Sequence, residues 1–288
     1  MMRFVRKLIL LTLVLMFTSI LAQGATPPAE TCGALVQQAM TEVESVCSQT
    51  GRNQACYGFV SLEATPRSGV LDFNFTRQGD LANVADLEMI KLDPLDSANN
   101  TWGIVMMKLQ ASLPETLPGQ NVTFLLFGDV EIENAVDPEA DPTLQPMQAF
   151  YFRTGITQTD CAAAPADGIL IQTPEGAGKV NLRANGVDIA LGSTAFLQAQ
   201  EDGSLTISVL EGESTVRSDG ETVVVPDGAD VEVPLEDFQP EGTPSAPEPY
   251  DLDFLDELPV DALPEEIVID QPSSDEELLE AALESDTI

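Results

Sequence analysis

Residues 204–233 read SLTISVLEGESTVRSDGETVVVPDGADVEV, and this stretch decides the fold class. Four short runs rich in apolar and β-branched residues are typical of strands and cover 204–210, 214–217, 222–225 and 230–233. Between them, 218–220 and 226–228 each contain an Asp-Gly pair, which favours a tight turn. Four short strands joined by glycine turns predict an antiparallel β unit.

The same pattern continues toward the N-terminus of this stretch. Further strands are expected at 57–64, 70–75, 103–110, 122–127, 130–132, 149–153, 168–172, 179–183, 187–190 and 195–200. Asn-Gly at 185–186 and Asp-Gly at 202–203 are strong hairpin signals, because both central positions of the favoured turn need a positive φ. Strands recurring about every 8–12 residues predict a mainly β fold, a sandwich or stacked meander, rather than an α/β enzyme fold.

A weak internal similarity links 122–132 with 205–216. Each segment has an apolar strand, a glycine and a second strand. Duplication explains this similarity about as well as two hairpins that arose independently.

One helix is expected before the strands, at 31–46. Its apolar residues recur at steps of three and four positions and are Leu35, Val36, Ala39, Met40, Val43 and Val46. We therefore predict an N-terminal domain at 25–160 with this amphipathic helix, a second β domain at 161–238, and a C-terminal tail at 239–288.

The first 24 residues are typical of a secretory signal peptide. Positive charges at Arg3, Arg6 and Lys7 precede an apolar run at 8–21, and small residues follow at the expected cleavage site. The run is short for a membrane span of about 20 residues, although an uncleaved anchor remains the alternative. We predict a secreted or extracytoplasmic protein, in the periplasm or at the cell surface, without a membrane span after cleavage.

The 288 residues include 48 acidic and 12 basic side chains and no histidine, for a net charge of -36. The absence of histidine excludes a Ser-His-Asp triad, a Cys-His pair and imidazole metal ligation. The negative charge disfavours binding to nucleic acid or to an anionic membrane surface.

The C-terminal tail is the most acidic part of the chain. From position 236 onward it contains 18 acidic residues, no Lys or Arg, and frequent proline, a composition expected to be disordered. Apolar residues alternate with these acids at 250–263, and Ser274 and Glu277 have the spacing of a helix capping box. The tail either docks a partner or keeps the protein soluble.

Four cysteines in an exported chain favour two disulfides. A helix at 31–46 would hold Cys32 and Cys47 about 22 Å apart, too far for a bond. We prefer Cys47–Cys56 with Cys32–Cys161, and Cys32–Cys56 with Cys47–Cys161 remains the alternative. A zinc site is disfavoured because no Cys-x-x-Cys pair is present.

From about 168 to 235 the chain resembles the periplasmic domain of FecR-type proteins, the iron-dicitrate signal transducers. The residues that carry the resemblance are GILIQT at 168–173, VDIALGS at 187–193, LTISVLEG at 205–212 and VVVPDGADV at 223–231. The resemblance implies a β-rich meander and an extracytoplasmic binding or scaffolding role. No anti-sigma segment accompanies it, and 32–155 has no family assignment.

No catalytic, cofactor or metal-binding residues are predicted. With 48 acids, no carboxylate pair is distinguished, and the acidic stretches at 137–141 and 251–257 lack the spacing of a calcium loop. We expect a non-enzymatic module that binds a protein or an envelope polymer, not nucleic acid. The alternatives are a secreted hydrolase with two carboxylates and a purely structural surface component.

Overall fold

The computed structural model describes residues 28–110, 121–136, 143–155, 161, 163–200 and 203–287. Its helices are α2 (Pro28–Cys47), α3 (Leu252–Leu255) and α4 (Asp275–Ser285), with 3-10 turns η1 (Val84–Asp86) and η2 (Val260–Ala262). The predicted signal peptide lies outside the described residues. Within them, no helix combines the length and the apolar character needed to cross a membrane.

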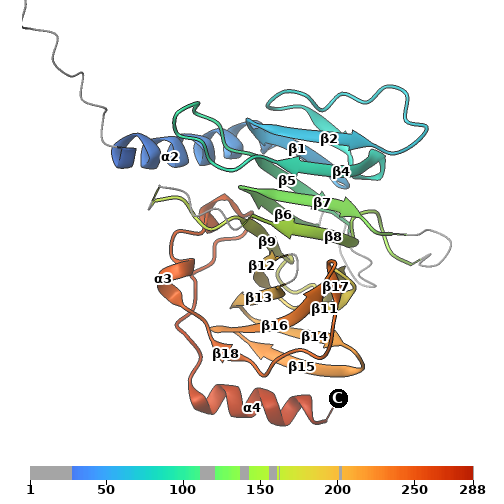
Figure 1. Ribbon diagram of the computed structural model, residues 1–288, viewed down its shortest axis with the longest axis vertical. Coiled ribbons are helices and arrows are strands. Elements are labelled where there is room, and N and C mark those ends of the chain that lie inside the picture. The colour runs from blue at the N-terminus through green and yellow to red at the C-terminus, as the bar shows by residue number, and fades with distance from the viewer. Residues whose placement is uncertain are drawn as a thin grey trace, which may run out of the picture.

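Two sheets make up the body of the protein (Figure 1). In sheet A the strand order is β17 (Gln239–Pro240), β16 (Ala229–Glu236), β13 (Ser204–Glu211), β12 (Thr194–Ala199), β9 (Gly168–Gln172), β6 (Val122–Phe127), β5 (Ile104–Leu109), β1 (Gln54–Phe59) and β3 (Leu81–Asn83), with β18 (Glu248–Pro249) also paired to β16. In sheet B the order is β15 (Glu221–Pro226), β14 (Glu213–Ser218), β11 (Val187–Leu191), β10 (Val180–Ala184), β8 (Ala149–Thr154), β7 (Val130–Asn134), β4 (Leu87–Leu92) and β2 (Leu62–Pro66). The predicted mainly β, sandwich-like class with an N-terminal helix is confirmed.

The chain crosses repeatedly from one sheet to the other, and glycines form two of these crossings. Gly128 joins β6 to β7 with φ 81°, and Gly212 joins β13 to β14 with φ 76°. β6 and β13 each follow a hairpin partner in sheet A, and β7 and β14 pair with β4 and β11 in sheet B. The two similar segments at 122–132 and 205–216 therefore occupy matching places in the sandwich.

The N-terminal and C-terminal halves share both sheets. β6 pairs with β9 in sheet A, and β8 pairs in parallel with β10 in sheet B. One hydrophobic core between the sheets includes residues of both halves, such as Phe124, Phe150 and Leu197. The expected domain boundary at 160/161 thus falls between strands that belong to one continuous pair of sheets.

A second hydrophobic cluster covers the outer face of sheet A. It joins α2 and the C-terminal segment to side chains of sheet A, among them Phe127, Leu170 and Phe196. Phe127 and Phe196 stack with ring centroids 6.0 Å apart. The outer face of this sheet is therefore buried.

The C-terminal segment is folded, which corrects the expectation of a disordered tail at 239–288. Its apolar residues are buried against sheet A and include Tyr250, Leu255, Leu258, Leu263 and Ile267. Most of the acidic side chains between these residues are exposed, so packing leaves most of the charge in water. In Figure 1 this segment runs beside sheet A and ends in α4, next to β15.

Both disulfides of the preferred pairing are present, and the alternative pairing is not. Cys32 is bonded to Cys161 and Cys47 to Cys56, with Cα–Cα distances of 6.0 Å and 5.7 Å. No free cysteine occurs in the part of the chain that the structure describes. The two bonds fix opposite ends of α2 to the β body.

Candidate functional site: an acidic groove beside the N-terminal helix

A groove lies between α2 and the C-terminal strap, which we define as residues 250–270. Its main part has a volume of about 440 Å³, and its lining residues are Gly33, Val36, Gln37, Met40, Glu44, Ala163, Asp256, Glu257, Leu258, Pro259, Asp261 and Ala262. A second hollow of about 260 Å³ continues it and shares Glu44, Asp261 and Ala262. We call these two hollows together the acidic groove.

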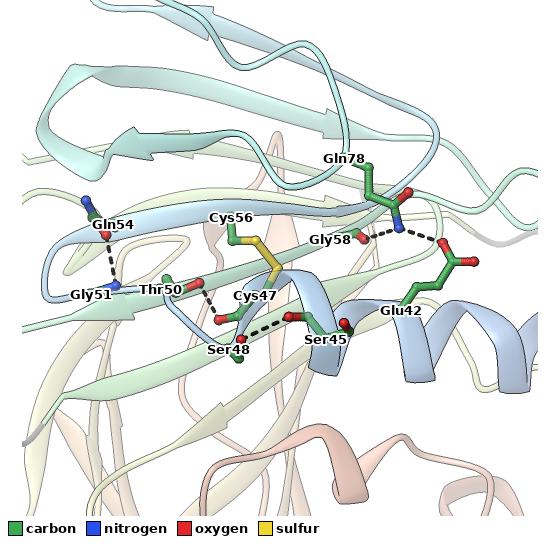
Figure 2. Close-up of a disulfide and its surroundings, with 10 residues drawn as sticks. All are labelled: Glu42, Ser45, Cys47, Ser48, Thr50, Gly51, Gln54, Cys56, Gly58 and Gln78. Carbon is green, nitrogen blue, oxygen red and sulfur yellow. Dashed lines mark hydrogen bonds between the residues drawn. A yellow bond between two sulfur atoms is a disulfide. The ribbon is translucent and has the colours of Figure 1, made fainter.

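The first wall of the groove is α2, which the sandwich holds rigidly. Figure 2 shows Cys47, at the C-terminal end of α2, bonded to Cys56 of β1. The Oγ1 atom of Thr50 donates to the carbonyl oxygen of Cys47 at 2.7 Å and closes this end of the helix. The other disulfide anchors the first turns of the helix, so this wall does not depend on helix propensity.

A polar contact on the far side of α2 also fixes its rotation. The Nε2 atom of Gln78 donates to Glu42 at 2.7 Å and to the carbonyl oxygen of Gly58 at 3.2 Å (Figure 2). The hydrogen bonds from Gln78 and Gln38 lower the pKa of Glu42. This face of the helix is turned to β1, which leaves Met40 and Glu44 facing the groove.

The second wall is the strap, whose backbone is hydrogen-bonded to a side chain of sheet A. The Nε2 atom of Gln172 donates to the carbonyl oxygen of Glu265 at 2.8 Å, and the amide of Glu265 donates back to Oε1 of Gln172 at 3.0 Å. The hydroxyl of Tyr250 donates to the carbonyl oxygen of Asp270 at 2.7 Å. The amide of Tyr250 donates to the carbonyl oxygen of Gly228 at 3.2 Å and that of Asp270 to the carbonyl oxygen of Leu210 at 3.3 Å, so both ends of the strap are fixed to the sandwich.

The groove combines an apolar floor with a negative rim. Leu258 and Ala262 are buried at its base, and half-buried Met40 faces them from α2. Four exposed acids surround the larger hollow, namely Glu44, Asp256, Glu257 and Asp261. Among the residues that the structure describes, no basic side chain lines this hollow, and Lys108 lines the smaller one. Such a surface favours a cationic group attached to apolar carbon.

The structure also brings together the carboxyl groups of Asp129 and Asp167. Asp167 is 7% exposed and its Oδ2 atom has no hydrogen-bond partner among the described residues. Burial, and then the nearby charge of Asp129, raises the pKa of Asp167 to about 7. A shifted pKa of this kind is found at catalytic sites, where the carboxyl group also faces a space for substrate.

The two carboxylates pack closely against glycines of neighbouring turns. A Cβ atom added to Gly128 would lie 1.8 Å from Oδ1 of Asp167, and one added to Gly155 would lie 2.3 Å from Oδ2 of Asp129. The Nη1 atom of Arg153 lies 3.7 Å from Oδ1 of Asp129. The pair is therefore packed into a corner of the sandwich.

The acidic stretches named in the sequence do not form a metal centre in the described residues. The stretch at 137–141 lies outside them. At 251–257, Asp251 accepts a hydrogen bond from the amide of Asp253 and caps α3. Among the residues that the structure describes, no group of three His, Cys, Asp or Glu side chains is arranged to hold a metal ion.

Sequence reasoning located the acids of the strap but not the groove. The apolar residues Val36 and Met40 were expected on the buried face of a helix, and they line the groove only because the strap packs beside α2. Comparisons with family models, curated proteins and solved structures found no match for this chain. The geometry of the site thus carries the functional argument.

Proposed function

We propose that this protein is an exported, non-enzymatic FecR-like module that binds a partner in the cell envelope. The acidic groove takes a cationic segment of a partner protein, with a lysine or arginine side chain lying along its apolar floor. The negative rim attracts the cationic partner, and the apolar floor covers the aliphatic part of the lysine or arginine side chain.

The observation that carries this proposal is the groove itself. Its larger hollow has four acids at the rim, no basic residue in its lining, and an apolar base. Two disulfides support the extracytoplasmic location, because such bonds persist in oxidising compartments. Export itself rests on the sequence of the first 24 residues.

The binding test uses a labelled peptide of alternating lysine and leucine, with a glutamate–leucine peptide as the negative probe. The groove variant is Asp256→Asn/Glu257→Gln/Asp261→Asn. Three exposed charge contacts at about 0.5 kcal/mol each predict about tenfold weaker binding of the lysine peptide, with a smaller dependence on salt.

The matched control removes the same number of charges from the exposed side of α4, as Glu276→Gln/Glu280→Gln/Glu284→Gln. Binding of the lysine peptide by this control should change less than about twofold, because salt screens charges that do not contact the peptide. The loss of general attraction is the same in both variants, so the difference between them measures the groove. Equal weakening by the two variants, or equal binding of the glutamate–leucine peptide by the native protein, would contradict a site in the groove.

The location is tested separately, by cell fractionation and thiol labelling of native material. We expect the protein outside the cytoplasm with all four cysteines unreactive. Free thiols in material from its natural compartment would contradict the extracytoplasmic assignment.

A further inference from the structure

A separate hollow lies on the outer face of sheet B, on the side of the sandwich away from the acidic groove. Its volume is about 200 Å³, and its lining residues are Glu131, Glu133, Tyr151, Phe152, Arg153 and Phe238. Pockets for complete small ligands are about 300–1,000 Å³. A hollow of this size on an open sheet accommodates one ring of a longer ligand.

The register of two strands places four side chains around this hollow. Glu131 lies opposite Arg153, and Glu133 lies opposite Tyr151, in the antiparallel pair of β7 and β8. Alternate residues of a strand share a face, so all four point away from the core. Tyr151 is 36% exposed, which places an aromatic ring on an otherwise polar sheet surface.

Phe238 adds a second ring from a strained turn. It joins β16 to β17, where Asp237 and Phe238 have φ 49° and φ 59°. A bulky residue with positive φ is unusual, since Gly or Asn adopts this conformation at a lower cost. Strain of this kind is retained where the side chain or the local geometry has a use.

A buried asparagine holds the strained turn over β8. The Nδ2 atom of Asn185 donates to the carbonyl oxygen of Phe238 at 3.2 Å and to that of Phe152 at 2.9 Å. The amide of Phe152 donates back to Oδ1 of Asn185 at 3.1 Å. Asn185 is completely buried, so the core holds the backbone at Phe238, whose side chain lines the hollow with Tyr151 and Arg153.

The charges around the hollow select the chemistry of a ligand. Arg153 lies 2.8 Å from Glu131 and 3.7 Å from Asp129, and Glu133 adds a third carboxylate. These acids repel an anionic ligand, and Arg153 already occupies the place that a cationic ligand would take. A neutral ligand with both donors and acceptors can bridge the guanidinium and the carboxylates.

We propose that this hollow, which we call the aromatic site, binds one neutral pyranose ring of a polysaccharide. The apolar face of the sugar lies on the rings of Tyr151 and Phe238, and its hydroxyls bond to Arg153 and Glu133. The site acts independently of the acidic groove. It provides the protein with a way to attach to an extracellular or envelope polymer.

The test measures binding of three neutral sugars, cellohexaose, maltohexaose and hexa-N-acetylchitohexaose, by calorimetry with the full chain. Hexagalacturonate, which has similar rings with a charge on each, is the negative probe. We expect at least one neutral hexaose to bind at millimolar concentration, and the free monosaccharide to bind more weakly, as expected for a polymer site.

Two variants then separate a binding role from a structural one. Phe238→Gly removes the ring and the strain together, so the melting temperature should stay equal or rise while affinity falls about tenfold, or about 1.4 kcal/mol. Tyr151→Ala should weaken binding similarly, and Tyr151→Phe should retain it. Phe254→Ala, at an exposed ring on α3, is the matched control and should change nothing.

Several results would overturn the proposal. These are the absence of binding by all three neutral hexaoses, equal binding of hexagalacturonate, and unchanged affinity in both Phe238→Gly and Tyr151→Ala. Loss of binding by Phe254→Ala would also contradict the placement of the site.

Discussion

Replacing Asp167 with asparagine should stabilise the protein at neutral and alkaline pH. The side chain is 7% exposed, its Oδ2 atom has no hydrogen-bond partner among the described residues, and the carboxylate of Asp129 is nearby. Burial and this neighbour raise its pKa from 3.8 to about 7. The folded protein therefore favours the neutral acid, which asparagine resembles in shape and charge.

The sign of the pH dependence follows from the proton count. Between pH 3.8 and about 7 the folded chain keeps a proton on Asp167 that the unfolded chain has released. The free energy of unfolding therefore falls as pH rises through this interval. The contribution of Asp167 to stability is largest below the interval, where the group is protonated in both the folded and the unfolded chain. At about 1.4 kcal/mol for each pH unit, the interval amounts to about 4 kcal/mol as an upper value.

Urea unfolding of native protein and Asp167→Asn between about pH 4 and pH 8 tests this reasoning. The variant should gain stability relative to the native protein as pH rises, by up to about 4 kcal/mol at pH 8. Asp230, whose pKa burial and the charges of Glu232 and Glu248 raise to about 6, is present in both proteins and cancels in the comparison. A stability difference that does not change with pH would refute the assignment, and Asp72→Asn, at an exposed site, gives the flat reference.

Three further outcomes are expected. Gly128→Ala should cost about 3 kcal/mol in urea unfolding or prevent folding, because the added Cβ would lie 1.8 Å from Asp167. Gly176→Ala, at φ 74° with open space around it, is the control and should cost about 1 kcal/mol. Equal costs would contradict the close packing at Gly128. Leu263→Ala should lower the free energy of unfolding by about 2–4 kcal/mol, whereas Val268→Ala, at a side chain that is 79% exposed, should leave it almost unchanged. No effect of Leu263→Ala would support a disordered tail. Replacing both cysteines of Cys32–Cys161, with sequence separation 129, by serine should cost about 5 kcal/mol, and the same change at Cys47–Cys56, with separation 9, about 3 kcal/mol, as measured by thermal unfolding. The opposite order would contradict the idea that each bond stabilises the protein by restricting the unfolded chain.

Local chemistry was sufficient for most of the strands and for the hairpin turn at 185–186. The expected strand at 70–75 is not a strand, 57–64 divides into β1 and β2 of different sheets, and β4 was not predicted. Asn185 and Gly186 have φ 50° and 80°, as the hairpin signal required, and they join β10 to β11. The capping box at Ser274 and Glu277 is present at the start of α4. These features depend on residues a few positions apart, so sequence spacing contains the needed information.

The fate of the acidic tail could not be predicted from its own composition. Charge and proline count describe the segment alone, whereas its folding depends on an apolar surface that distant strands create. A signal was present elsewhere, because β6 and β9 are apolar at nearly every position and are buried on both faces. Something had to cover the outer face of sheet A, and the sequence did not name the strap.

Sequence alone therefore determined the β class, the N-terminal helix and the chemistry that the absence of histidine excludes. Tertiary structure decided where the strap lies, how α2 and the strap form the acidic groove, and how Phe238 comes to lie beside Tyr151. The physical reason is distance along the chain. Turns, caps and periodicity act over a few residues, whereas grooves arise where surfaces far apart in sequence bury their apolar atoms together.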